Sequence, residues 1–159
     1  MSRRKDTSVT LIIFGVVVII VAAFLLLVLP NIAQSTTKVW LGDGIFQARV
    51  ISSEADRSKG LSGVENLAAD QALLMVFPHS EKWGIWMKDM KVPIDIVWLN
   101  EDKRVVYIVK NASPETSELE RFVPKSEARY VIELPAGTVD SKVITTNRTA
   151  VFDIEEGIK

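Results

Sequence analysis

One uncharged stretch near the start of the chain, Val9 to Leu29, most constrains what this sequence can fold into. It runs for 21 residues, and only Thr10 and Gly15 interrupt its apolar side chains. A helix rises about 1.5 Å per residue, so a helix of this length would be about 31 Å long, which matches the hydrocarbon core of a bilayer. The stretch therefore predicts one transmembrane helix followed by a separate domain.

The charges on either side of this stretch predict its orientation. Arg3, Arg4 and Lys5 precede it, and no charged residue follows it until Lys38. Basic residues are enriched at the cytoplasmic end of a membrane span. We therefore expect the N-terminus in the cytoplasm and the larger C-terminal part outside the membrane. A cleaved signal peptide is the alternative, although the apolar region of such a peptide is typically only ~7–15 residues long.

On this interpretation the chain has four parts. They are a cytoplasmic N-terminus (residues 1–8), a transmembrane helix (9–29), a linker (30–37) and an external or periplasmic domain (38–159). The expected location is the cell membrane, with a single span and with the lipid bilayer as the partner of the N-terminal helix.

Composition limits the chemistry of the predicted external domain. The chain has no cysteine, which excludes disulfides, thiolate nucleophiles and cysteine-ligated zinc. The domain carries 16 basic and 19 acidic residues, and this net negative charge argues against nucleic acid as a partner. His79 is the only histidine in the sequence, so we expect neither a metal site nor a cofactor.

Short apolar runs separated by turn residues make up most of this domain. A helix is predicted over Glu54–Lys59, with Ser53 or Ser52 as its N-cap and Gly60 at its end. The predicted strands are Lys38–Leu41, Ile45–Ile51, Ala72–Phe77, Trp83–Met87, Ile94–Leu99, Val105–Val109, Ala128–Leu134, Val143–Thr146 and Thr149–Ile154. Many short strands with one short helix indicate a mainly β domain, either a compact β-sandwich or a barrel.

Two motifs carry a resemblance to a known family. The first is Trp-Met-Lys at 86–88 with Pro-Ile-Asp-Ile at 93–96, and the second is Ala-Arg-Tyr-Val-Ile-Glu-Leu-Pro-Ala-Gly at 128–137. From Phe46 onwards the chain resembles the uncharacterised family called domain of unknown function 192. The resemblance implies a compact β-sandwich of jelly-roll type, often behind a signal peptide or membrane anchor, and implies no activity. The chain departs from the family pattern at Asp89, where asparagine is usual.

Charged and aromatic side chains within these motifs form the candidate site. Arg129 and Glu133 share one face of their predicted strand, because alternate strand residues point the same way. The candidate ligand-binding residues are Trp86, Lys88, Asp89, Asp95, Arg129 and Glu133. A structural role is the alternative for Asp95, which could accept backbone N–H bonds or pair with Arg129. For Arg129 and Glu133 the alternative is a fixed salt-bridge network.

Three functions are compatible with these residues. The first is a membrane-anchored domain that binds a polar ligand or an envelope protein or glycan. The second is a hydrolase of envelope glycan or peptide, in which two of Asp89, Asp95 and Glu133 would act as acid and base. The third is an accessory subunit of a membrane complex. No residue is assigned a catalytic role, and Asn147, in an Asn-Arg-Thr triplet, is a possible glycosylation acceptor.

Overall fold

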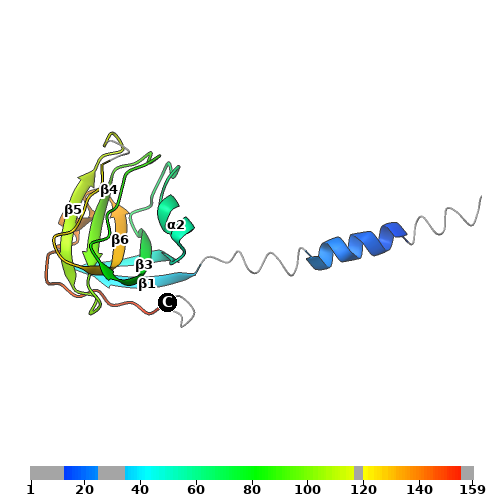
Figure 1. The fold of residues 1–159 in the computed structure, drawn as a ribbon, viewed down its shortest axis with the longest axis horizontal. Coiled ribbons are helices and arrows are strands. Elements are labelled where there is room, and N and C mark those ends of the chain that lie inside the picture. The colour runs from blue at the N-terminus through cyan, green and yellow to red at the C-terminus, as the bar shows by residue number, and fades with distance from the viewer. Residues whose placement is uncertain (1–12, 25–34, 117–119, 155–159) are drawn as a thin grey trace, which may run out of the picture. The chain divides into compact units, whose positions relative to one another are not determined.

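The structure is a computed structural model, and it describes residues 13–24, 35–116 and 120–154. The chain divides into two units, Met1–Gln34 and Ser35–Lys159. In the first unit, residues 13–24 form a helix with exposed apolar side chains (Figure 1). No helix within the described ranges is long and apolar enough to cross a membrane. The other parts of the predicted span, residues 9–12 and 25–29, lie outside the described residues, as do residues 1–8 and 30–34.

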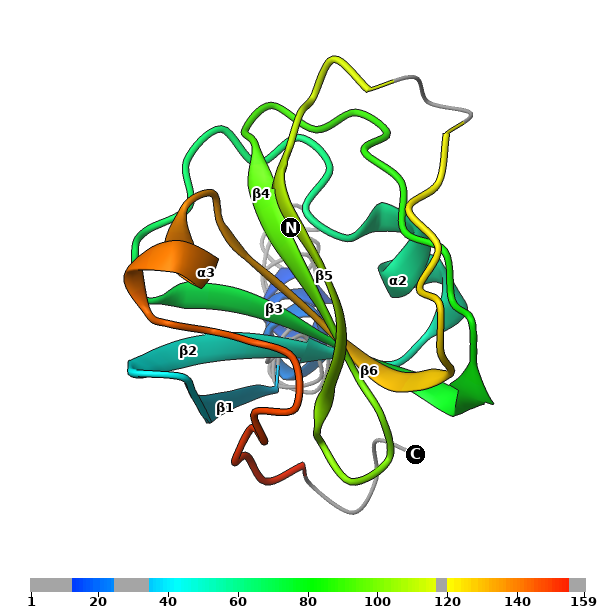
Figure 2. The same ribbon diagram turned by 90° about the vertical axis from the view of Figure 1, so that its left-hand side faces the viewer.

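The second unit is built on one mixed six-stranded sheet with the order β1-β2-β3-β6-β4-β5 (Figures 1 and 2). Its strands are β1 (Thr36–Leu41), β2 (Gly44–Ile51), β3 (Gln71–Glu81), β4 (Ile94–Leu99), β5 (Val105–Ala112) and β6 (Ala128–Pro135). Only the pair β2 and β3 is parallel among these neighbours. The short helix α2 (Glu54–Lys59) lies in the connection between these two strands, and α3 (Thr138–Ser141) follows β6.

Both faces of the sheet are covered, and each carries a hydrophobic cluster. Successive side chains of a strand point to opposite faces. β4 therefore places Ile94, Ile96 and Trp98 in one cluster and Val97 and Leu99 in the other. We call the face with Trp98 the pocket face and the face with Val97 the opposite face. Because β4 is buried on both faces, all six of its residues are buried.

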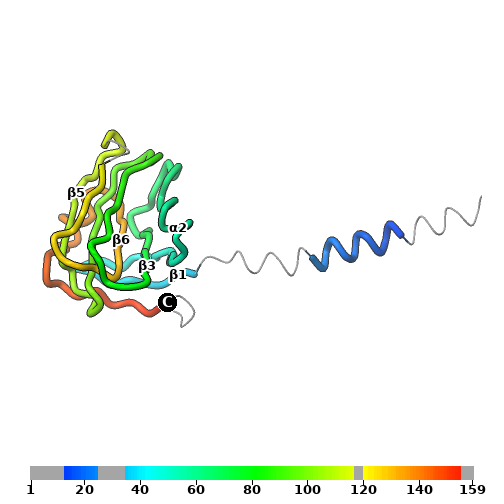
Figure 3. The backbone as a smooth tube through the Cα atoms, in the orientation of Figure 1, coloured from blue at the N-terminus to red at the C-terminus, as the bar shows by residue number. Residues whose placement is uncertain are grey.

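A segment near the C-terminus links the two edges of the sheet (Figure 3). Val151 and Trp40 of the edge strand β1 exchange two backbone hydrogen bonds of 2.9 Å each. A few residues earlier, the Val105 N–H of the other edge strand, β5, donates to the Arg148 carbonyl at 2.8 Å. The Ala150 N–H donates to the carbonyl of Lys103 at 2.9 Å. Residues 147–151 thus satisfy backbone groups at both edges.

The mainly β class and several local predictions are confirmed. The helix spans Glu54–Lys59 as predicted, and the Ser53 hydroxyl accepts a hydrogen bond from the Asp56 N–H. The predicted strands Lys38–Leu41 and Ile45–Ile51 correspond to β1 and β2, which form a hairpin. The predicted strands Ile94–Leu99 and Val105–Val109 correspond to β4 and β5, which form a second hairpin.

The arrangement differs from the expected sandwich, because the six strands join in a single sheet rather than in two packed sheets. β6 pairs with both β3 and β4 and so connects the two hairpins. The predicted strand Trp83–Met87 is reduced to one bridge between Ile85 and Phe122. The last two predicted strands, over 143–146 and 149–154, were wrong. Val143 has a φ of 52°, and Thr149 and Val151 form isolated bridges instead of a ladder.

Candidate functional site

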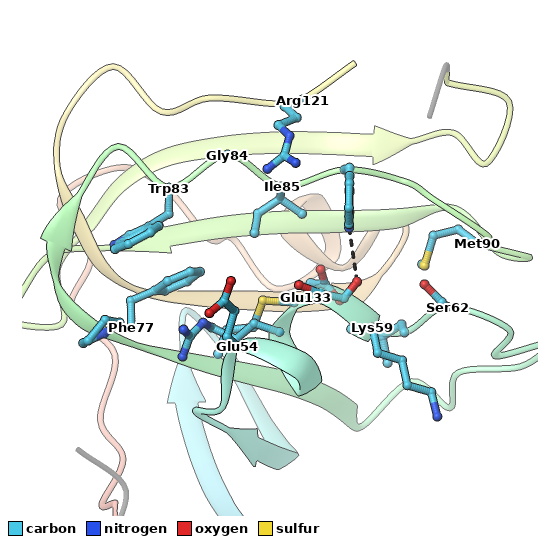
Figure 4. A pocket seen from close by; sticks show the side chains of 17 residues that line it. Glu54, Lys59, Ser62, Phe77, Trp83, Gly84, Ile85, Met90, Arg121 and Glu133 are labelled. Atoms are coloured by element: carbon cyan, nitrogen blue, oxygen red, sulfur yellow. Dashed lines mark hydrogen bonds between the residues drawn. The ribbon is translucent and has the colours of Figure 1, made fainter. Parts of the chain in front are cut away.

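A cavity of about 450 Å³ lies on the pocket face, between α2 and the segment 83–90 (Figure 4). Its lining includes Glu54, Arg57, Ser58, Lys59 and Gly60 from α2 and its end, Met75 and Phe77 from β3, Trp83 and Trp86 from the segment after β3, Arg121, and Glu133 from β6. Cavities that hold small molecules commonly have volumes of ~300–1,000 Å³. The volume and the mixture of aromatic and charged groups are therefore suitable for a small ligand.

One side of the cavity is formed by α2, and two arginines hold this helix over the sheet. The Arg57 guanidinium donates to the carbonyls of Ser52 and Val76, the latter at 3.1 Å. Arg49 of β2 donates to the Gly60 carbonyl at 3.0 Å. These bonds tie the last turn of α2 to β3 and the glycine at its end to β2.

Gly60 ends α2 close to Met75 and Glu133, two other residues of the cavity lining. Its φ is 51°, a value that residues with a Cβ rarely adopt. A Cβ at this position would lie 3.3 Å from Met75 Cε and 3.7 Å from Glu133 Oε2. Glycine therefore lets the backbone turn closely over the Glu133 carboxyl group.

Trp86 forms a wall of the cavity and is itself held by polar contacts. Its indole N–H donates to the Ser58 carbonyl at 3.3 Å, the bond drawn as a dashed line in Figure 4. The Arg121 guanidinium lies 4.5 Å from the centre of the Trp86 ring system, and the Lys88 ammonium lies 5.9 Å from it. These are cation–π distances. The ring thus already interacts with two cations of the protein.

A second aromatic group lies at the other end of the cavity. Phe77 and Trp83 stack with their ring centres 4.7 Å apart and an angle of 16° between their planes. The Arg57 guanidinium lies 5.0 Å from the centre of the Phe77 ring. An arginine therefore makes a cation–π contact with an aromatic residue at each end of the cavity.

Glu133 is the buried ionisable group of this site. Its side chain is 3% exposed, and its Oε2 atom has no hydrogen-bond partner among the described residues. Burial raises the pKa of Glu133 from 4.5 to about 8, and the positive charge of Arg49 opposes this rise. At neutral pH the side chain is therefore mostly a neutral acid that can donate a hydrogen bond. A buried polar group left unpaired costs roughly 1–3 kcal/mol, so a ligand atom that pairs with it would gain.

The structure places Asp95 on the opposite face, away from the cavity. Its neighbours Ile94 and Ile96 point to the pocket face, so strand alternation turns Asp95 the other way. Its fully buried carboxylate accepts hydrogen bonds from the Asn111 N–H at 2.8 Å and the Val139 N–H at 2.7 Å. These bonds confirm the structural alternative, in which Asp95 accepts backbone N–H groups.

Three other predicted residues are also absent from the cavity lining: Lys88, Asp89 and Arg129. Lys88 and Asp89 are exposed, and the Asp89 carbonyl accepts the Gly63 N–H at 2.9 Å. The φ of Asp89 is 55°, a conformation that asparagine and aspartate adopt more readily than most residues. Aspartate in place of the usual asparagine therefore preserves the backbone requirement at this turn.

Of the six predicted ligand-binding residues, Trp86 and Glu133 line the cavity. The proposed hydrolytic pairs are not assembled there, because Asp95 lies on the opposite face and Asp89 is outside the lining. Sequence reasoning missed Arg57, Gly60 and Arg121 as parts of the site. A signal existed for Gly60, which was expected to end the helix. Arg121 lies in a long irregular segment, where no periodicity places a side chain.

Fold and cavity together define a mainly β domain with a pocket of small-molecule size. The chain belongs to the family described as DUF192, an uncharacterized ACR, whose sequence profile matches residues 37–152. A UPF0127 protein of Thermococcus gammatolerans is 32% identical over 129 residues, which cover 79% of this chain and 70% of the relative. A UPF0127 protein of Thermococcus sibiricus is 30% identical, with 69% of this chain and 65% of the relative covered.

Two crystal structures share the fold. A protein of Sinorhizobium meliloti, named provisionally as a transcription regulator, superposes with a TM-score of 0.72 at 21% identity and covers 76% of this chain and 96% of its own. A protein of unknown function from Novosphingobium aromaticivorans gives a TM-score of 0.67 at 19% identity, with coverage of 74% and 84%. At these identities the likeness concerns the fold alone.

Proposed function

We propose that the β domain binds a small polar ligand in the cavity between α2 and the segment 83–90. The observation that carries the proposal is the buried Oε2 atom of Glu133, which lacks a hydrogen-bond partner among the described residues and belongs to a residue that lines the cavity. Native proteins rarely leave buried polar atoms unpaired, and such atoms often mark a binding site or an ordered water. Trp86 lines the same cavity and supplies apolar surface for the rest of the ligand.

The experiment is ligand-observed NMR with a fragment library on the full chain in a nonionic detergent. We expect a group of polar aromatic fragments to give saturation-transfer signals that Trp86→Ala abolishes. Trp40→Ala is the matched control, because Trp40 lies on the edge strand β1 and outside the cavity lining. Fragment signals that respond equally to both tryptophan variants would contradict a ligand site in the cavity.

The second part of the proposal is that residues 9–29 anchor this domain to a membrane, with the domain on the external side. It is supported by the length of the apolar stretch, by the three basic residues before it, and by the exposed apolar side chains of the helix over 13–24. N-terminal sequencing of protein from the membrane fraction tests it. A mature chain that begins near Gln34 would show a cleaved signal peptide instead of an anchor.

A further inference from the structure

We infer that the ligand presents a carboxylate to the unpaired Glu133 side chain and to the arginines of the cavity, while an apolar or aromatic body of the ligand lies against Trp86. This inference rests on the proposed function and specifies its ligand class. It depends on three features of the cavity: the positive charge of its lining, the arginines beside its aromatic rings, and the unpaired buried oxygen of Glu133.

The first feature is an excess of positive charge in the lining of the cavity. Arg57 and Lys59 from α2 and Arg121 line the same cavity, and Glu54 is the one other acidic residue of the lining. The guanidinium of Arg49 approaches Glu133 from β2 and acts on its ionisation. The domain as a whole carries more acidic than basic residues, so this positive cluster is a local concentration. An anionic group on the ligand would be attracted to it.

The second feature argues against a cationic ligand. Aromatic residues in a cavity commonly bind ligand cations through their ring faces. Here the Trp86 ring already has the Arg121 guanidinium 4.5 Å from its centre, and the Phe77 ring has that of Arg57 at 5.0 Å. A ligand ammonium group placed against either ring would lie close to these arginines and would be repelled by their like charge. A carboxylate could instead accept hydrogen bonds from the same guanidinium groups.

The third feature is the unpaired, buried carboxyl group of Glu133. Its Oε2 atom is buried, and Gly60 passes so closely that a Cβ there would be 3.7 Å away. In this dry environment the carboxyl group holds its proton at neutral pH, because burial raises its pKa to about 8. A neutral carboxyl group beside a carboxylate forms a charge-assisted O–H···O⁻ bond, which is stronger than a bond between two neutral groups. The unpaired oxygen would then gain a partner without a second buried charge on the protein.

Three probes with the same phenylpropyl carbon skeleton test this inference: 3-phenylpropanoate, 3-phenylpropanamide and 3-phenylpropylamine. Each is titrated calorimetrically into the full chain in a nonionic detergent. We expect the carboxylate to bind at least about tenfold more tightly than the amine at pH 6.5. Its affinity should fall by about tenfold or more between pH 6.5 and 9.5, as Glu133 loses its proton.

Two variants distinguish proton donation from other effects. Glu133→Gln keeps an N–H donor but cannot ionise, so it should bind the carboxylate with an affinity that changes less than about twofold over this pH range. Glu127→Gln, an exposed glutamate next to β6, should keep the pH profile of the unmodified protein. A tighter complex with the amine, strengthening as pH rises, would overturn the inference and leave the proposed binding function intact. Failure of all three probes to bind at millimolar concentration would count against both the inferred ligand class and the proposed binding function.

Discussion

Replacing Glu133 with glutamine should stabilise the folded domain, and the gain should grow with pH. The carboxyl group is almost fully buried, and burial raises its pKa from 4.5 to about 8. A group whose pKa is raised by folding binds its proton more tightly in the folded state than in the unfolded state. Its contribution to stability is therefore complete below pH 4.5 and is lost as the pH rises through 8.

The size of the effect follows from the two pKa values of Glu133. Between them, each pH unit lowers the free energy of unfolding by about 1.4 kcal/mol. With a folded-state pKa of about 8, the loss is about 3 kcal/mol at pH 7 and about 5 kcal/mol at pH 9. Glutamine has a similar shape but no ionisable proton, so the variant avoids this loss. The variant and the unmodified protein should be nearly equally stable at pH 4.

The assay is urea unfolding of the full chain in a nonionic detergent, followed by tryptophan fluorescence from pH 4 to 9. Trp98 is fully buried and will report the loss of the fold. Glu127→Gln is the control, and as an exposed substitution it should change stability by less than about 0.5 kcal/mol at every pH. A stability difference for Glu133→Gln that stays constant across the pH range would refute the reasoning, because it would mean that folding leaves the pKa unchanged.

Two further stability changes follow from contacts described above, and both can be measured by urea unfolding at pH 7. Asp95→Ala should cost about 3 kcal/mol because it leaves the buried Val139 N–H and the partly buried Asn111 N–H without their acceptor; a cost no larger than that of the exposed control Asp102→Ala would contradict this role. Gly42→Ala should be more destabilising than Gly63→Ala. Both have positive φ, but a Cβ at Gly42 would lie 2.2 Å from the Lys142 carbonyl oxygen and one at Gly63 would contact nothing. Equal losses of stability in the two variants would show that the positive φ, and not the contact with Lys142, determines the cost of adding a Cβ.

The sequence predicted features whose causes lie within a few residues. The helix Glu54–Lys59 was predictable because its N-cap, its acidic first turn and its terminal glycine are all adjacent. The β1–β2 hairpin was predictable because Gly42 supplies the positive φ of the turn.

Features that depend on distant residues were not predictable in the same way. α3 is absent from the predicted elements, and the Val139 N–H within it bonds to a carboxylate 44 residues earlier, on Asp95. The cavity depends on Arg121 reaching the ring of Trp86 from another part of the chain. The single sheet depends on β6 entering between β3 and β4. Local periodicity identifies a strand, but it does not identify the neighbours with which the strand pairs.

The segment over 147–151 has a consequence for how the protein is made. It bonds to β1 and β5, yet it is synthesised after both. Until it has emerged from the ribosome, the nascent sheet exposes N–H and C=O groups at two edges, and such edges pair readily with strands of other chains. Aggregation of the nascent chain is therefore expected in the interval after the strands have emerged and before residues 147–151 have emerged. A chain that ends before this point would keep both edges open permanently.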